Sequence, residues 1–297
     1  MLESKQKATS VPDVAKDALQ ERYFGHEHVT WIVPVRGWYG LNLRELWAYR
    51  ELLVVLTMRD IKVRYKQTVL GAAWAILQPF MTMVVFTIFF GHLASMPSDG
   101  YPYPVFVYAA LLPWMFFANA ITSSSNSLVG SAHLINKVYF PRLVIPLSAV
   151  GAGIVDFAVA SVILLAMMLF YGVGWSLNLL VAPVLLLSVL FIALGAGTCL
   201  SALTVTYRDF RYVVPFMVQV WMFVTPVVYP ASLVPTQWRW LIFLNPMSGL
   251  IEGFRAVFLG KAFDFFGLAI SSVVAMSLFL VGVSYFERVE RRFADII

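Results

Sequence analysis

The ionisable and nucleophilic side chains of this sequence are few, and they are not grouped as a catalytic site requires. No phosphate-binding loop of the form G-x-x-x-x-G-K-[ST] occurs, so we do not expect the chain to bind ATP in that manner. It also has no His-Glu-x-x-His and no Gly-x-Ser-x-Gly motif, and its four histidines (His26, His28, His92, His133) are too scattered for a metal site. The sequence therefore indicates passage of a substrate rather than catalysis.

Asp156 is the strongest single candidate, because an ionisable residue inside an apolar span is a functional candidate by default. It follows Arg142 by 14 residues, which places it about 21 Å along a helix and past the middle of a bilayer. We expect it to face the interior of the bundle and to pair with Arg255. Glu252, three residues before Arg255 on the same helix face, is the alternative partner of that arginine. A structural role for Asp156 is favoured over a proton relay.

The elements that must position these groups belong to a membrane protein. The 297 residues are 60% hydrophobic and 12% charged, with mean hydropathy +0.80, whereas ordinary soluble domains are about 25% charged. The net charge of +5 comes from dispersed basic residues, which favours anionic lipid head groups over nucleic acid as a partner. Cys199 is the single cysteine, so no disulfide can form within one chain.

The intervals without charge predict six transmembrane helices, because a span needs about 20 apolar residues. The predicted spans are about 71–93, 104–128, 143–171, one between 178 and 207, 212–229 and 265–286. With the N-terminus inside, the cytoplasmic segments hold 18 Lys and Arg residues and the outside segments hold 3. The positive-inside rule thus predicts an all-α integral membrane fold with both termini in the cytoplasm.

The region before the first span divides into two parts. Residues 1–41 have no apolar core of the kind a signal peptide needs, and we expect a cytoplasmic tail. We expect residues 42–70 to form an amphipathic helix in the membrane interface, and residues 71–297 to form the six-span domain. The alternative for residues 42–70 is a soluble helix that packs on its own chain. Four basic residues crowd the end of this helix: Arg59, Lys62, Arg64 and Lys66.

Two further segments predict close packing or irregular backbone. Between spans five and six, Pro235, Pro246, Gly249 and Gly253 break an apolar stretch into pieces too short to span. We expect two short re-entrant helices there, entering from outside, since irregular backbone at depth must line a cavity or be buried in protein. In span four, small residues at 193, 197 and 201 predict a close helix contact, within the bundle or at a dimer interface.

Two cytoplasmic loops mix aromatic and basic side chains. They read HLINKVYFPR (133–142) and YRDFR (207–211). Such loops suit short helices that seat in a groove on a cytoplasmic partner, or they anchor at the lipid head groups, where Tyr and Arg settle. The candidate coupling residues are Lys137, Tyr139, Phe140, Arg142, Arg208, Asp209 and Arg211.

Taken together, these motifs resemble the permease of type-2 ABC exporters of bacterial polysaccharides. The resemblance covers about residues 40–297 and rests on RDIKVRYKQTVLGAAWAILQP (59–79), KVYFPR (137–142), YRDFR (207–211) and NPMSGLIEGFR (245–255). It implies a homodimer in the inner membrane with two copies of a separate ATPase subunit, which holds ATP and Mg; this chain then needs no cofactor. It also implies that the loop around 137–142 forms the cytoplasmic gate and coupling region, with the loop 207–211 near the same entrance.

The resemblance also suggests a role for the aromatic side chains of spans one and five. Flat apolar faces with polar rims suit sugar rings, so these residues are candidates for lining a conduit. The alternative for each is lipid contact or core packing. The candidates are Trp74, Phe86, Phe89, Phe90, Phe216, Trp221, Phe223 and Tyr229.

The function that this resemblance implies is export of a lipid-linked polysaccharide, such as an O-antigen, capsular polysaccharide or teichoic acid. Alternatives are an exporter of a smaller lipid or drug, a membrane-embedded lipid-modifying enzyme, or a passive channel. The enzyme alternative lacks a catalytic cluster.

Overall fold

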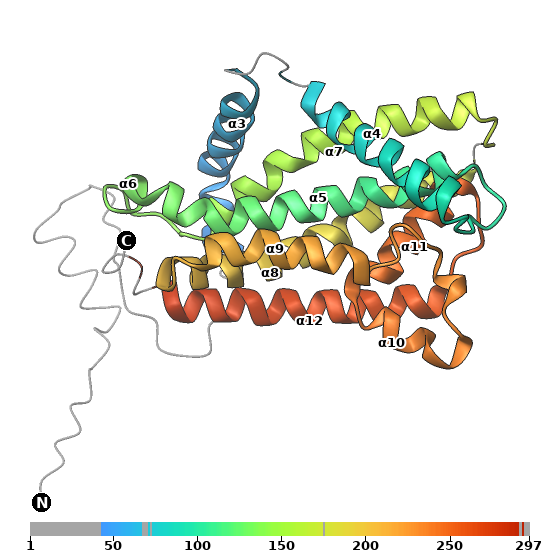
Figure 1. The fold of residues 1–297 in the computed structure, drawn as a ribbon. Coiled ribbons are helices and arrows are strands. Elements are labelled where there is room, and N and C mark those ends of the chain that lie inside the picture. Colours follow the sequence, from blue (N-terminus) through green and yellow to red (C-terminus); the bar gives the residue numbers. More distant parts are fainter. Residues whose placement is uncertain (1–42, 67–70, 72, 175, 291–292, 294–297) are drawn as a thin grey trace, which may run out of the picture. The chain divides into compact units, whose positions relative to one another are not determined.

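The computed structural model describes residues 43–66, 71, 73–174, 176–290 and 293 (Figure 1). The predicted tail, 1–41, and residues 67–70 at the end of the predicted interfacial helix lie outside the described residues. Within the described part, every regular element is a helix, which confirms the all-α prediction. The elements are α2 (Leu43–Ala48), α3 (Arg50–Lys66), α4 (Ala73–Phe86), the π-helix η1 (Thr87–Leu93), α5 (Tyr103–Gly130), α6 (Ala132–Ile135), α7 (Val144–Phe170), the 3₁₀ turn η2 (Leu177–Val181), α8 (Ala182–Thr206), α9 (Phe210–Val224), the 3₁₀ turns η3 (Ala231–Leu233) and η4 (Thr236–Trp238), α10 (Arg239–Phe243), α11 (Pro246–Leu259) and α12 (Phe265–Glu290).

Helix α5 is the centre of the bundle. It contacts α4, α7, α8, α9 and α11 and runs through the middle of the ribbon in Figure 1. Of its most apolar stretch, 78% is buried, against 17–28% for the other four long helices. Three hydroxyls in its second half are bonded locally, since those of Thr122, Ser125 and Ser127 donate to carbonyls three or four residues earlier. Such back-bonding lets a polar stripe exist inside an apolar bundle.

Small residues let α8 approach two neighbours at once. A Cβ at Gly197 would lie 2.6 Å from the Ser124 hydroxyl of α5, and a Cβ at Gly282 of α12 would lie 1.9 Å from the carbonyl oxygen of Gly195. Ala193, Gly197 and Ser201 are all buried inside this chain. The predicted close-packing face is therefore confirmed, and it lies within the bundle.

In the part of the chain that the structure describes, five helices are long and apolar enough to cross a membrane, and they coincide with predicted spans one, two, three, four and six. The predicted fifth span, 212–229, is shorter than expected, because α9 has 15 residues and ends at Val224. Thr225 is extended, with ψ 139°, as expected for a residue that precedes a proline, here Pro226. The count of five rises to six if the bent pair 236–243 and 246–259 is one span.

That bent pair has a sharp and well-defined corner. Its two helical parts meet at 106°. Asn245 caps α11 by accepting a hydrogen bond from the Met247 amide (3.1 Å), and Pro246 occupies the first turn. The prediction that Gly249 and Gly253 interrupt this segment is wrong: both lie inside α11, where a Cβ would meet Ser271 and Leu185. Their role is close packing. A re-entrant position in the membrane stays a prediction.

Helices α2 and α3 form nearly one helix, since the amide of Leu53 donates to the carbonyl of Tyr49 across the break (3.0 Å). Helix α3 packs on α7, with Leu56 buried in a second hydrophobic cluster that includes Phe140 and Phe286. Val55 and Val63 are 62% and 70% exposed. Apolar side chains thus occur on more than one side of α3, and its interfacial, amphipathic character stays a prediction.

Candidate functional site

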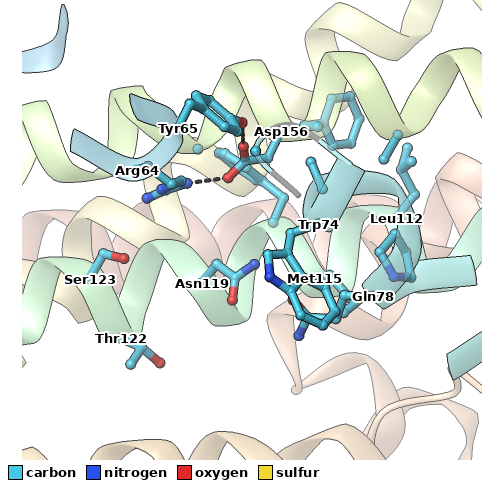
Figure 2. A pocket seen from close by; sticks show the side chains of 17 residues that line it. Arg64, Tyr65, Trp74, Gln78, Leu112, Met115, Asn119, Thr122, Ser123 and Asp156 are labelled. Carbon is cyan, nitrogen blue, oxygen red and sulfur yellow. Dashed lines mark hydrogen bonds and ion pairs between the residues drawn. The ribbon is translucent and has the colours of Figure 1, made fainter. Parts of the chain in front are cut away.

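Asp156 lies where α3 meets α7, and its partners come from the last turn of α3. The Arg64 guanidinium and the Tyr65 hydroxyl donate hydrogen bonds to its two carboxylate oxygens (Figure 2). The side chains of Arg64 and Asp156 are 33% and 20% exposed. Burial, with a smaller contribution from the Asp156 carboxylate, raises the pKa of Tyr65 to about 12. The phenol therefore stays protonated and remains a donor at any physiological pH.

The predicted pairing of Asp156 with Arg255 is wrong. Arg255 is fully buried and its two terminal nitrogens are bonded elsewhere: they donate to Glu252 (2.7 Å) and to the carbonyls of Val227 (2.7 Å) and Tyr229 (3.2 Å). The alternative, a local pair with Glu252, is confirmed. Glu252 also accepts from the Ala231 amide (3.1 Å), so the pair ties α11 to the segment that follows α9. A buried arginine needs this degree of pairing, because an uncompensated buried charge is costly.

A second ion pair joins the loops at the same end of the bundle. Lys261 donates to Asp99 (2.6 Å), and the Ser232 hydroxyl donates to the same carboxylate (2.9 Å). Burial opposes ionisation of Asp99, but the hydrogen bonds from Lys261 and Ser232 outweigh it and hold the pKa of that carboxyl below its usual range. These contacts cross-link the loops at the α11 end of the bundle.

Beside Asp156 opens a cleft of about 330 Å³ with polar and apolar walls, bounded by α3, α4, α5 and α7 (Figure 2). Trp74 and Gln78 of α4 and Asn119 and Ser123 of α5 line it, and Trp74 is 53% exposed. Its apolar wall is formed by Pro79, Leu112, Met115, Phe116, Phe157 and Ala160. The volume lies at the lower end of the range of about 300–1,000 Å³ typical of small-molecule sites.

A second, shallower cavity of about 260 Å³ shares Arg64 and Ser123 with this cleft. Asn126 and Ser127 of α5 line it, and so does Asp60 of α3. Asp60 pairs with Arg59 (2.8 Å) and accepts from the Ser148 hydroxyl (3.2 Å). Together, the two cavities make a polar track along α5 that leads from Trp74 toward the end of the bundle that bears α6.

The predicted interfacial basic residues therefore divide into two pairs. Arg59 and Arg64 line the polar track and hold carboxylates. Lys62 and Lys66 are exposed on the helix surface.

The predicted aromatic pathway does not gather into one lining within this chain. Trp74, Phe89, Phe216 and Phe223 are each more than half exposed, whereas Phe86, Phe90, Trp221 and Tyr229 are partly buried against the main hydrophobic core. Trp221 in particular packs edge-on against Phe117 and donates to Asn245 (3.0 Å). Helix α4 packs against α5 and α7, and α9 packs against α5 and α8. A shared lining would need a second chain and stays a prediction.

The predicted coupling loops differ in how they are held. Lys137 and Tyr139 are exposed, whereas Phe140 is buried, and Arg142 donates to the Glu290 carbonyl at the end of α12. The loop 133–142 is therefore anchored at its C-terminal side, while Lys137 and Tyr139 in its middle are exposed. Arg208, Asp209 and Arg211 are all exposed at the turn between α8 and α9.

Gln78, Asn119, Thr122 and Ser123 are the cleft residues that sequence reasoning missed. Asn119, Thr122, Ser123 and Asn126 recur at steps of three and four, a polar stripe on one face of a span that is otherwise apolar. That periodicity was a usable signal. Among the described residues, no group of three or more His, Cys, Asp or Glu is placed to hold a metal ion.

Comparison of this sequence with known proteins identifies a family and several related proteins. Residues 51–259 match the family described as ABC-2 type transporter. The O-antigen export system permease protein RfbA of Myxococcus xanthus is 31% identical over 261 residues, which cover 86% of this chain and 98% of that protein. The protein of the same name from Klebsiella pneumoniae is 29% identical over 248 residues, 83% of this chain and 95% of that protein. The polysialic acid transport protein KpsM of Escherichia coli is 25% identical over 203 residues, 66% of this chain and 77% of that protein.

Proposed function

Because this chain belongs to the ABC-2 type transporter family, we propose that it is the permease of an ATP-driven exporter of lipid-linked polysaccharide. One observation carries the choice of substrate class. The relatives named as O-antigen export permeases match this chain over 95–98% of their own length, so the likeness is not confined to one shared segment. The related protein named for polysialic acid transport adds a second carbohydrate polymer.

The described structure supports transport rather than catalysis. It offers a bundle of apolar helices, a cleft with polar side chains and an exposed tryptophan, and ion pairs whose formal charges cancel. Exposed tryptophan rings and side-chain amides are groups that bind sugars through stacking and hydrogen bonds. A lipid-linked glycan would find here both a membrane-embedded surface and polar contacts.

The partners belong to this proposal. We propose a homodimer with two copies of a separate ATPase, which binds ATP and Mg and drives the cycle. The exposed residues Lys137, Tyr139, Arg208 and Arg211 are available for contact with that subunit. The chain lies in the bacterial inner membrane with both termini in the cytoplasm, since that orientation places most basic residues inside. Helix α3 then lies at the cytoplasmic interface, and α10–α11 dip in from the outside.

The experiment is deletion of the gene in its own organism, followed by measurement of surface glycan and of lipid-linked glycan in the inner membrane. The expected result is loss of the surface polymer with accumulation of the lipid-linked form, both reversed by the wild-type gene. Surface polymer at normal levels in the deletion strain would overturn the proposal. If the deletion changes only the export of a drug or a smaller lipid, that compound and not a polysaccharide is the substrate.

A further inference from the structure

We propose that the cleft between α3, α4, α5 and α7 is a binding site for one sugar ring of the exported glycan. This inference rests on the proposed function and deepens it. It places a specific sugar contact within a single chain, separate from any lining that two chains form together.

The aromatic platform is Trp74. Its side chain is 53% exposed although it lies on an apolar helix, and it opens into the cleft rather than into the core (Figure 2). The indole offers a broad apolar face, and such faces bind the C–H surface of a sugar ring while its polar edge stays free. Phe86, one of the other aromatics of α4, packs edge-on against Phe90 and lines no such polar opening.

The hydrogen-bonding groups are two amides with unused capacity. Gln78 and Asn119 line the cleft, and neither side chain has a hydrogen bond within the described part of the chain. A side-chain amide carries two donor hydrogens and an acceptor oxygen, which match the hydroxyls of a sugar. Ser123 adds a hydroxyl on the same side. Polar groups inside a membrane bundle are costly unless they find partners, so these groups favour a polar occupant.

The charge of the cleft selects a neutral sugar over a pyrophosphate. Among the described residues, Arg64 is the cationic side chain that lines it, and this guanidinium is already bound to Asp156. The formal charges of the pair cancel. A pyrophosphate would have to displace the Asp156 carboxylate and leave it beside two phosphates, which electrostatics opposes. A sugar hydroxyl, by contrast, can add a hydrogen bond to the carboxylate without breaking the pair.

The proposal is tested with a photo-crosslinking side chain at Met115, which lines the cleft and leaves Trp74, Gln78 and Asn119 in place. The Met115→p-benzoylphenylalanine chain is purified full length in nanodiscs and illuminated with one of two probes. The first is a polyprenyl pyrophosphate that carries one N-acetylglucosamine, and the second is the same lipid without sugar. We expect at least fivefold more labelling by the first, and competition by free methyl N-acetylglucosaminide.

The matched control carries the same photo-crosslinker at Val162, which is 62% exposed on α7. It lies two residues past the cleft residue Ala160, about 200° around the helix. We expect it to label equally with both lipids. When they are combined with Met115→p-benzoylphenylalanine, Trp74→Leu and Asn119→Leu should each lower sugar-dependent labelling at least fivefold.

Equal crosslinking of the two lipids to the Met115→p-benzoylphenylalanine chain would overturn the sugar site, and so would an absence of crosslinking. To separate folding from binding, the unsubstituted chain is labelled by a diazirine analogue of methyl N-acetylglucosaminide, and the peptides are identified. Labelled peptides from 74–79 or 112–123 support the site, and labelling elsewhere overturns it. Loss of surface glycan on deletion, without any sugar-dependent labelling, would overturn this site while the exporter function stands.

Discussion

Asp156 and Arg64 are 92 residues apart in the chain, yet together with Tyr65 they join the end of α3 to the middle of α7. The pair is partly exposed, so its strength is less than that of a fully buried ion pair, for which removal of one partner costs about 3–5 kcal/mol. Hydrogen bonds to charged groups contribute about 1.5–3 kcal/mol. The contact is therefore the main polar attachment of α3 to the bundle in the described chain.

A double-mutant cycle measures that attachment. We expect Asp156→Asn and Arg64→Gln each to lower the free energy of unfolding by about 2 kcal/mol, and the double variant to lose less than their sum. Chemical unfolding in one detergent gives the three values. Lys62→Gln, an exposed neighbour on α3, serves as the control and should change little. Strictly additive losses at positions 64 and 156 would contradict the pairing.

The phenol of Tyr65 gives this contact a dependence on alkaline pH. Folding raises the pKa of Tyr65 from 10.0 to about 12. Its contribution to stability is therefore complete below pH 10 and is lost as the pH rises from 10 toward 12. Tyr65→Phe should be less stable than wild type at pH 8 and should lose less stability than wild type between pH 10 and 12. Stability is measured by thermal unfolding at each pH. An identical loss of stability in both proteins at alkaline pH would show that Tyr65 is not the titrating group.

At the scale of elements, α8 depends on close contact with both α5 and α12. Interiors are close-packed, and a forced extra methyl group costs about 1–3 kcal/mol. The approach of α8 to α12 is the tighter of the two, because a Cβ at Gly282 would meet the backbone of Gly195 and not a movable side chain.

The corresponding prediction is that Gly282→Ala separates α8 from α12 and lowers stability by about 1–3 kcal/mol or more. Gly130→Ala is the matched control, since nothing lies within 4 Å of a Cβ at the end of α5, and a gain of up to about 1 kcal/mol in helix propensity is expected. Thermal unfolding midpoints of the purified proteins compare the two. Equal effects of both substitutions would contradict the close approach.

The elements also show what the sequence could predict and why the rest was missed. Long charge-free intervals located five helices, because apolar length alone decides a span. The end of α9 depended on Pro226 and Thr225, a local backbone effect that a hydropathy interval does not see. The partner of Asp156 was missed because packing of α3 on α7, which sequence spacing does not reveal, brings Arg64 beside it.

At the scale of the whole molecule, the cleft combines residues from four helices. Trp74 and Gln78 come from α4, Asn119 and Ser123 from α5, and Asp156 from α7, with Arg64 at the end of α3. The spacing within α5 marks Asn119 and Ser123 as one polar face, but no motif joins them to the residues of α3, α4 and α7. Only the fold brings them together. The sequence motifs, by contrast, sufficed for the family, because they are contiguous and lie at helix boundaries.

The function that we propose for this chain is ATP-driven movement of a lipid-linked glycan across the membrane. The direct measurement uses inverted inner-membrane vesicles whose outward-facing cytoplasmic leaflet carries the organism's lipid-linked glycan. A glycosidase is added outside the vesicles. With ATP, we expect the glycan to become protected over time in vesicles that contain the chain, and to stay digestible with a non-hydrolysable analogue or without the chain. Protection that is independent of ATP or of the chain would contradict ATP-driven transport by this protein.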